Sequence, residues 1–170
     1  MKRMSTMALA LAGLALGTEA YAAQNSAIGT GTANARIITA ISITPGTALN
    51  FGDVVPSGVV GTVSVDAAGV RTSAGGASLG GATGVAAGAF TINGQASATY
   101  AITLPANGVV TVTSGANSMA VNGFVSNPGP TGTLTAGGTQ PLAVGATLSV
   151  GVNQAAGSYT GTYQVTVAYN

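Results

Sequence analysis

The sequence predicts an all-β fold, a β-sandwich or barrel of short strands. Three observations support this prediction. Apolar residues beyond the N-terminal region recur with a period of two, typical of half-buried strands, rather than with the helical period of 3.6. Turn residues are frequent, since the 170 residues include 27 Gly and 6 Pro. No segment of this part of the chain combines a helical period with helix caps.

The first 22 residues have the features of a secretory signal peptide. Lys2 and Arg3 form a positively charged start, residues 7–16 are apolar, and Ala20 and Ala22 form a small-x-small cleavage site. The apolar run is too short for a membrane-spanning helix, which needs about 20 residues. We therefore expect export, cleavage after Ala22, and no membrane insertion after cleavage.

The composition of the sequence excludes several classes of protein. Charged residues make up 4% of the sequence, and Cys, His and Trp are absent. Disulfides, Cys or His metal sites, cysteine proteases and Ser-His-Asp hydrolases are therefore excluded. The basic surface of a nucleic-acid-binding protein is also missing. After cleavage the remaining charges balance, which favours association; they belong to Arg36, Arg71, Asp53 and Asp66.

Asp53 and Asp66 are the only carboxylate side chains of the exported chain. A glycosidase needs two carboxylates about 5–10 Å apart, and nothing in the sequence places these two together. We interpret both as strand-end or turn residues, since Asp66 opens a turn that ends at Gly69. Two aspartates are also few for a calcium site. We therefore predict that the protein is not an enzyme and has no catalytic residues, metal or cofactor.

The alternating segments define the expected strands. In the first half of the exported chain they lie at residues 36–44, at residues 49–55, at residues 61–66, and around Phe90 and Ile92. In the second half they lie at residues 100–104, 109–113, 119–125 and 142–150. Asn107-Gly108 is typical of a tight hairpin turn, which predicts that the strands on either side of it pair.

The C-terminal segment shows the clearest alternation. From Tyr159 onward, one face carries aromatic, β-branched and glycine residues, while the other carries mostly Thr and Gln. This pattern predicts a half-buried last strand. With no linker and no internal repeat, the chain divides into a signal peptide at residues 1–22, a flexible N-terminal extension at residues 23–35, and one domain at residues 36–170.

Two stretches of the sequence resemble a known group of proteins. They are ISIT…LNFG at residues 41–52 and VGATLSVGVNQAAGSYTGTYQVTVAYN at residues 144–170. The C-terminal stretch resembles the subunits of chaperone–usher fimbriae, including the branch similar to spore coat protein U. Both stretches resemble a family of secreted bacterial domains more closely. The resemblance implies an immunoglobulin-like, pilin-like antiparallel sandwich that lacks its final strand.

The resemblance also implies a function. It implies a structural subunit of a surface fibre or coat, secreted through the periplasm, that forms a homo-oligomeric filament by β-strand complementation. A periplasmic chaperone and an outer-membrane usher would be its partners. The residues expected to form the C-terminal edge used in assembly are Gly157, Tyr159, Gly161, Tyr163, Val165, Val167 and Tyr169.

The donor strand is less well defined than the acceptor. The extension reads AQNSAIGTGTANA and offers few bulky apolar residues; the candidate donor positions are Ala27, Ile28, Ala33, Ala35 and Ile37. Three possibilities remain open. The extension inserts weakly, residues 36–44 are exchanged instead, or the domain is complete by itself. The last possibility corresponds to a monomeric secreted or surface adhesin or binding module.

Overall fold

The computed structural model describes residues 26–170, so the predicted signal peptide at residues 1–22 lies outside the described residues. The described chain is all-β, and every strand pairing in it is antiparallel. The prediction of an all-β antiparallel sandwich is confirmed. None of the described segments is a helix long and apolar enough to cross a membrane.

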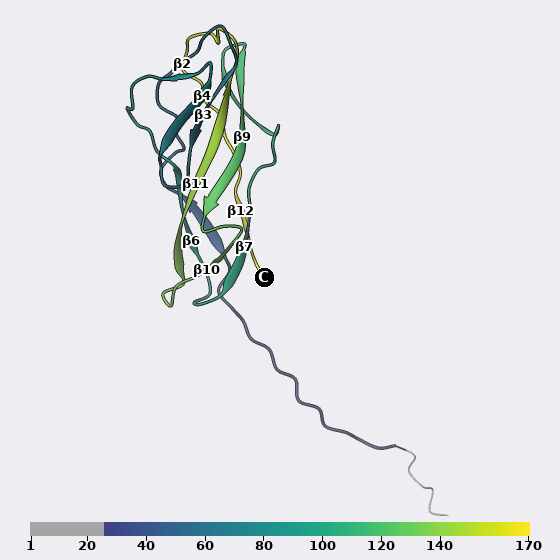
Figure 1. Ribbon diagram of the computed structural model, residues 1–170. Coiled ribbons are helices and arrows are strands. Elements are labelled where there is room, and N and C mark those ends of the chain that lie inside the picture. Colours follow the sequence, from purple (N-terminus) through teal and green to yellow (C-terminus); the bar gives the residue numbers. More distant parts are fainter. Residues whose placement is uncertain (1–25) are drawn as a thin grey trace, which may run out of the picture. The chain divides into compact units, whose positions relative to one another are not determined.

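Figure 1 labels many of the strands along the chain, which runs from purple to yellow. Their bounds are β1 Ser42–Pro45, β2 Val54–Val55, β3 Gly61–Val65, β4 Arg71–Gly75, β5 Ser78–Leu79, β6 Gly88–Asn93, β7 Thr99–Thr103, β8 Val110–Ser114, β9 Asn117–Asn127, β10 Thr131–Thr133, β11 Thr139–Val150 and β12 Thr166–Tyr169.

The long strand β11 is the centre of the larger sheet (Figure 1). One of its edges pairs with β6 along residues 139–144 and with β3 along residues 146–150. Its other edge pairs with β9. The strands β1, β4 and β8 extend this sheet beyond β6, β3 and β9. A smaller sheet has the order β10-β7-β12, and β2 and β5 form a separate short ribbon.

The core lies between these layers in two clusters of buried residues. The first cluster joins β3, β8, β9 and β11, and contains Val63, Ala77, Val110, Met119, Val121, Ala146, Leu148 and Val150. The second joins β6 and β11 to the smaller sheet, and contains Ile92, Tyr100, Ile102, Leu134, Leu142 and Val144. Phe124 and Tyr163 pack against both clusters and connect them. The alternating residues predicted for β11 are all on the buried face.

Three strand predictions need correction. The strand expected at residues 49–55 is reduced to β2 at Val54–Val55 and an isolated bridge at Asn50. The strand expected at residues 36–44 is shorter than predicted. β1 covers only Ser42–Pro45, and Ile37, near the start of the expected strand, is 97% exposed. The hairpin expected at Asn107-Gly108 does not form: β7 pairs with β10 and β12, whereas β8 pairs with β9. The tight turn lies instead between Ser114 and Asn117, where Gly115 has a φ of 59°.

The chain divides into two compact units, residues 1–36 and residues 37–170. In the first unit, the described residues 26–36 form no strand and are exposed. The second unit contains both core clusters and every described strand.

Candidate assembly groove

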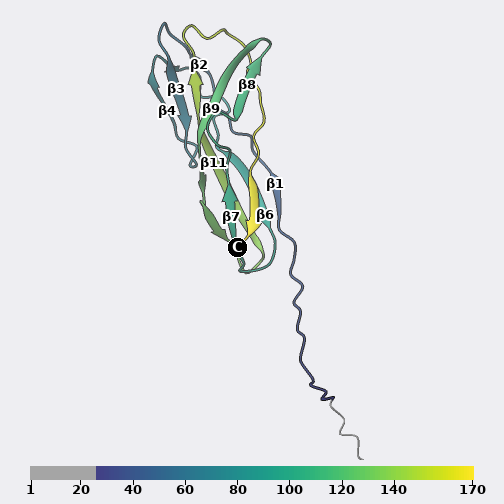
Figure 2. The same ribbon diagram turned by 90° about the vertical axis from the view of Figure 1, so that its right-hand side faces the viewer.

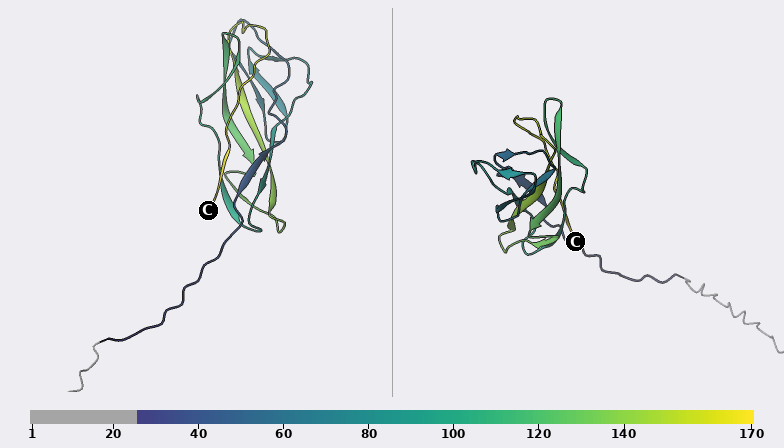
Figure 3. Two further views of the ribbon diagram at one scale, coloured as in Figure 1. Left: turned by 180° about the vertical axis from the view of Figure 1, so that it is seen from behind. Right: turned by 45° about the horizontal axis from the view of Figure 1, so that its top comes forward.

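The C-terminal segment places its alternate residues against the core, as its pattern predicts. Tyr159 packs against the first core cluster, Tyr163 against both, and Val165, Val167 and Tyr169 against the second. The intervening residues are exposed. Figure 2 shows this segment in yellow, running along the sandwich to β12, and Figure 3 shows it from behind.

Gly157 and Gly161 do not pack against the core, since both are exposed. A Cβ atom at Gly161 would collide with the carbonyl oxygen of Thr111, and one at Gly157 would collide with the side-chain oxygen of Ser114. The two glycines therefore let the segment pass close to β8.

The backbone of this segment is paired only at Thr160 and from Thr166 onward. Thr160 exchanges hydrogen bonds with Thr113 of β8, at N···O distances of 3.0 and 2.8 Å. β12 pairs with β7. Between them, no backbone hydrogen bond joins residues 161–165 to another segment of the described chain. The predicted last strand is therefore interrupted, although its face alternates along its whole length.

A groove of about 670 Å³ opens beside the first part of the segment and reaches as far as Gly161. One wall is formed by residues 48–54, and the other by residues 154–161. The buried side chains of Met119, Leu148 and Val150 line it, so the first core cluster reaches the surface here. The groove therefore combines an apolar floor with a wall in which residues 155–159 make no backbone–backbone hydrogen bond within the described chain.

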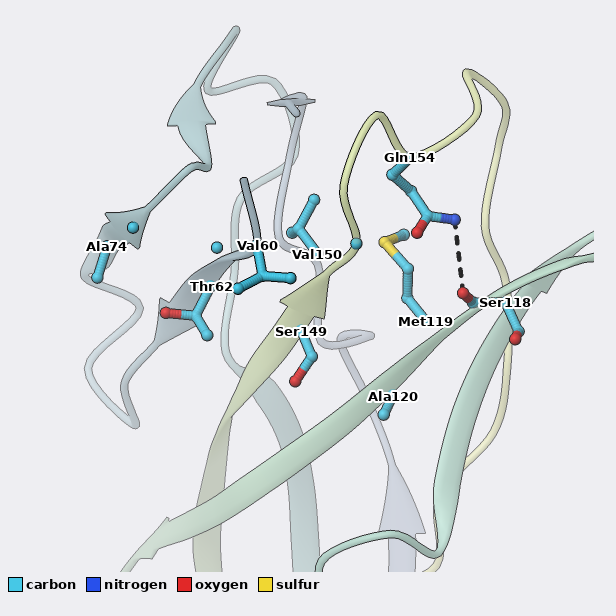
Figure 4. A pocket seen from close by; sticks show the side chains of 12 residues that line it. Val60, Thr62, Ala74, Ser118, Met119, Ala120, Ser149, Val150 and Gln154 are labelled. Carbon is cyan, nitrogen blue, oxygen red and sulfur yellow. Dashed lines mark hydrogen bonds between the residues drawn. The ribbon is translucent and has the colours of Figure 1, made fainter. Parts of the chain in front are cut away.

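A second cleft of about 520 Å³ lies between β9 and β3, where β9 has left the edge of β11 (Figure 4). Met119, Val150 and Gln154 line both the cleft and the groove. The Nε2 atom of Gln154 donates to the carbonyl oxygen of Ser118 at 3.4 Å, over Met119 (Figure 4). Gln154 therefore lies at the boundary between the two cavities.

Tyrosine hydroxyl groups fix both ends of the C-terminal segment. Tyr159 accepts a hydrogen bond from Gln154 Nε2 at 2.8 Å and donates one to the carbonyl oxygen of Ala155 at 2.7 Å. Tyr169 accepts one from the backbone N–H of Gln95 at 2.5 Å and donates one to the carbonyl oxygen of Thr39 at 2.8 Å. The segment is thus held at its ends, while its middle lacks backbone partners.

The middle of the segment is held by aromatic packing. The ring of Tyr163 lies 6.0 Å from that of Phe90 in an edge-on arrangement and 5.3 Å from that of Phe124. Burial raises the pKa of the Tyr163 hydroxyl above that of a free tyrosine.

Arg71 holds one wall of the groove in place by hydrogen bonds to backbone carbonyl oxygens, a role that the sequence did not predict. Its guanidinium group donates to the carbonyl oxygens of Phe51 at 2.9 Å, Asp53 at 3.1 Å, Gly80 at 3.1 Å and Gly81 at 3.1 Å. It therefore ties residues 51–53, which belong to one wall of the groove, to the loop at residues 80–81.

Asp66 forms the turn that the sequence predicts. Its Oδ1 atom accepts from the backbone N–H groups of Ala68 and Val70, at 2.9 and 2.8 Å, and its carbonyl oxygen accepts from Gly69 at 3.0 Å. Asp53 is exposed and contributes to the groove wall.

Most of the candidate donor residues belong to a different unit from the residues of the C-terminal edge. Ala27, Ile28, Ala33 and Ala35 belong to the first compact unit and are exposed, with Ile28 at 98%. Ile37 begins the second unit and is also exposed. The sequence thus identified Gly157, Tyr159 and Gly161 of the groove, but not the opposite wall at residues 48–54.

Residues 41–169 match a protein family described as a domain of unknown function (DUF4402). No curated protein matches the chain. No solved structure matches it either.

Proposed function

We propose a function for this chain, which belongs to the DUF4402 family. It is a structural subunit of an extracellular or surface fibre or coat, assembled by β-strand complementation between subunits. The single observation that carries the proposal is the groove lined by residues 154–161, of which residues 155–159 and 161 make no backbone–backbone hydrogen bond within the described chain. There, an apolar floor and unpaired backbone lie next to each other.

An added strand would satisfy both features of the groove at once. Its backbone would pair with free N–H and C=O groups, and its alternate side chains would cover Met119, Leu148 and Val150. The scarcity of charge supports the same role, because the described chain carries no excess charge that would keep subunits apart. The role requires no catalytic group.

The extension at residues 23–35 is the preferred donor. Its described part is exposed and contributes no strand to its own subunit, so it is available without breaking existing pairs. Residues 36–44 are less suitable, because residues 42–44 already pair with β6. A donor from one subunit and a groove on the next give a head-to-tail contact, which extends into a filament.

Export supports a location at the cell surface. The N-terminal pattern predicts secretion, and a subunit with an open groove would need protection before assembly. A periplasmic chaperone that occupies the groove and an outer-membrane usher are the partners proposed for this step.

The absence of cysteine allows a direct test by cross-linking. In the double variant Thr30→Cys/Ser158→Cys, one cysteine lies in the extension and the other lines the groove. Oxidation should produce a ladder of disulfide-linked multimers that collapses to a monomer on reduction. The control Thr30→Cys/Thr72→Cys places the second cysteine at an exposed position of β4 and should give no such ladder.

A second measurement separates fibre from monomer. Protein recovered from the surface of the exporting cell should run as a ladder on an SDS gel and collapse to one band on boiling. Deletion of residues 23–35 should abolish the ladder. A single soluble monomer that unfolds reversibly would contradict the proposal and would favour the alternative, a self-complete secreted or surface adhesin or binding module.

A further inference from the structure

Exposed valines cluster at one end of the second compact unit, which we call its tip. Three of them lie at the end of β2 and in the loop that follows, and one lies just after β11. A hydrogen bond joins the two loops, from the N–H of Asn153 to the carbonyl oxygen of Ser57 at 2.8 Å. The tip valines are Val55, Val59, Val60 and Val152, and each is more than half exposed. Apolar side chains gathered in this way are typical of a contact surface.

The tip is continuous with the groove. Pro56, which follows Val55, lines the groove, and Val60 lines the neighbouring cleft. Asp53 is an exposed residue of the groove wall. A strand that leaves the groove at the tip would therefore pass Asp53 and then the tip valines.

The chain enters the second unit at its other end, which we call the base. There, the carbonyl oxygen of Thr39 accepts a hydrogen bond from the hydroxyl group of Tyr169 at 2.8 Å, close to the C-terminus. Figures 1 and 2 show the C-terminus and β2 at opposite ends of the sandwich. β11 runs between the two ends and has 12 residues, so the base and the tip are about 35 Å apart at about 3.3 Å per residue.

The base carries exposed apolar residues and directly follows the proposed donor. Ile37 and Ile38 are exposed, and only Arg36 separates them from the extension at residues 23–35. An extended chain spans at most about 3.6 Å per residue, so Thr39 of the donor subunit lies no more than about 15 Å from the groove that holds its extension. The base of the donor subunit therefore has to lie beside the acceptor subunit, at the end where the extension leaves the groove.

The few charges of the described chain favour the tip as this end. Asp66 uses its carboxylate within its own turn, and the guanidinium group of Arg71 bonds to carbonyl oxygens. The remaining charges within residues 26–170 are Arg36 and Asp53, and both side chains are exposed. Arg36 comes immediately after the extension, and Asp53 lies on the groove wall next to the tip. Opposite charges thus stand at matching places on the donor and on the acceptor.

We propose that the tip docks the base of the next subunit in the fibre. The two isoleucines of the base pack against the tip valines, and Arg36 pairs with Asp53. This inference rests on the proposed fibre function and names a second contact between the same two subunits. Packing the isoleucines against the valines removes apolar surface from water on both sides. The exposed ion pair adds little affinity, but it selects the end at which the extension leaves the groove, because a reversed insertion would separate the charges.

The docking surface is too small to hold two free subunits together. A stable interface buries about 800 Å² on each partner, which is more than these few side chains expose. Once the extension is in the groove, the tip and the base are held at a high effective concentration, so that a small contact suffices. Deletion of residues 23–35 should therefore also abolish the docking.

Cysteine pairing tests the docking. In the double variant Ile38→Cys/Val60→Cys, one cysteine lies at the base and the other at the tip. A disulfide needs Cα atoms within about 7 Å of each other, so the two cysteines of one subunit cannot bond. Oxidation should therefore give a ladder of multimers that collapses on reduction. The matched control Ile38→Cys/Val70→Cys should give no ladder, because Val70 is also more than half exposed but lies at the opposite end of the hairpin of β3 and β4.

The double variant Thr30→Cys/Ser158→Cys keeps this test separate from that of the fibre itself. If it gives a ladder and Ile38→Cys/Val60→Cys does not, the docking is overturned and the fibre function stands. Ladders of equal extent from the Val60 and Val70 pairs would also overturn the docking, since they would report random collisions. If neither the extension pair nor the docking pair gives a ladder, both the fibre function and the docking are overturned.

Charge reversal tests the ion pair in the protein without cysteines. Arg36→Asp and Asp53→Arg should each make the SDS ladder collapse at a lower temperature than that of the wild type, because like charges would meet. The double variant Arg36→Asp/Asp53→Arg should restore the collapse temperature, since opposite charges meet again. A double variant no more heat-resistant than the single ones would overturn the pairing of Arg36 with Asp53.

Discussion

Asn107 and Asn122 each bind the backbone of the glycine that follows the other. The Oδ1 atom of Asn107 accepts a hydrogen bond from Gly123 N–H at 2.8 Å, and that of Asn122 accepts one from Gly108 N–H at 2.7 Å. Both glycines have a positive φ, 81° at Gly108 and 57° at Gly123. This reciprocal pair ties the turn after β7 to the middle of β9, which belongs to the other sheet.

The reciprocal pair gives a first prediction. Asn107→Ala should lower the free energy of unfolding by about 1 kcal/mol, because the N–H of Gly123 loses its partner. Asn107→Asp keeps an acceptor at the same position and should lose less. Urea denaturation of both variants measures the difference. Equal stabilities for Asn107→Ala and the wild type would show that the pair contributes nothing.

Arg71 gives a second prediction. Arg71→Ala should lower the free energy of unfolding by about 2 kcal/mol, since hydrogen bonds from a charged donor to several carbonyl oxygens are lost together. Arg71→Lys should recover only part of this, because an ammonium group lacks the planar fork of donors. Hydrogen exchange should speed up at the N–H of Gly80, which bonds to Asp53 O at 2.9 Å. Unchanged exchange there would rule out a role for Arg71 in fixing the groove wall.

The pKa of Tyr163 gives a third prediction. Burial raises this pKa in the folded protein, so the unfolded chain ionises first as the pH increases. The neutral Tyr163 side chain therefore contributes fully to the free energy of unfolding below a pH of about 10, the ordinary pKa of tyrosine. This contribution is lost as the pH rises through the pKa of the folded protein. Tyr163→Phe should reduce this alkaline loss. Thermal unfolding at neutral and strongly alkaline pH tests it, and an identical alkaline loss in the variant would contradict it.

The packing around Tyr163 gives a fourth prediction. A Cβ atom at Gly88 would collide with the Tyr163 hydroxyl, so Gly88→Ala should displace this ring and lower the free energy of unfolding by about 1–3 kcal/mol. The control is Gly58→Ala, since a Cβ atom there meets open space. Denaturation curves of the two variants should therefore differ. Similar curves would mean that Tyr163 can move aside at little cost.

The sequence predicted the fold best where one face is buried without interruption. β11 buries every alternate residue from Leu142 to Val150, as the pattern predicts, and departs from it only at Gly145, which is buried as well. β4 and β10 were missed, because their residues are small or polar and mostly exposed. Such strands are fixed by pairing with a neighbour, and a neighbour distant in the chain leaves no local pattern.

Only one of the two walls of the candidate groove could be predicted from the sequence. The C-terminal edge was visible, because Tyr159, Tyr163 and Tyr169 recur on one face. The opposite wall depends on Arg71, whose partners are carbonyl oxygens and therefore leave no signature in residue type. The hairpin expected at Asn107-Gly108 was wrong for a similar reason, since the two asparagines bind across the fold rather than within a turn.

The position of the few basic residues has a consequence for proteolysis. Trypsin cuts after Lys and Arg, and within residues 26–170 it would find only Arg36 and Arg71. The guanidinium group of Arg71 is engaged by carbonyl oxygens, whereas Arg36 is exposed at the boundary between the two compact units. One cut would therefore release the extension from an intact sandwich. A digest that spares assembled material but trims free subunits would report directly on whether the extension is shielded.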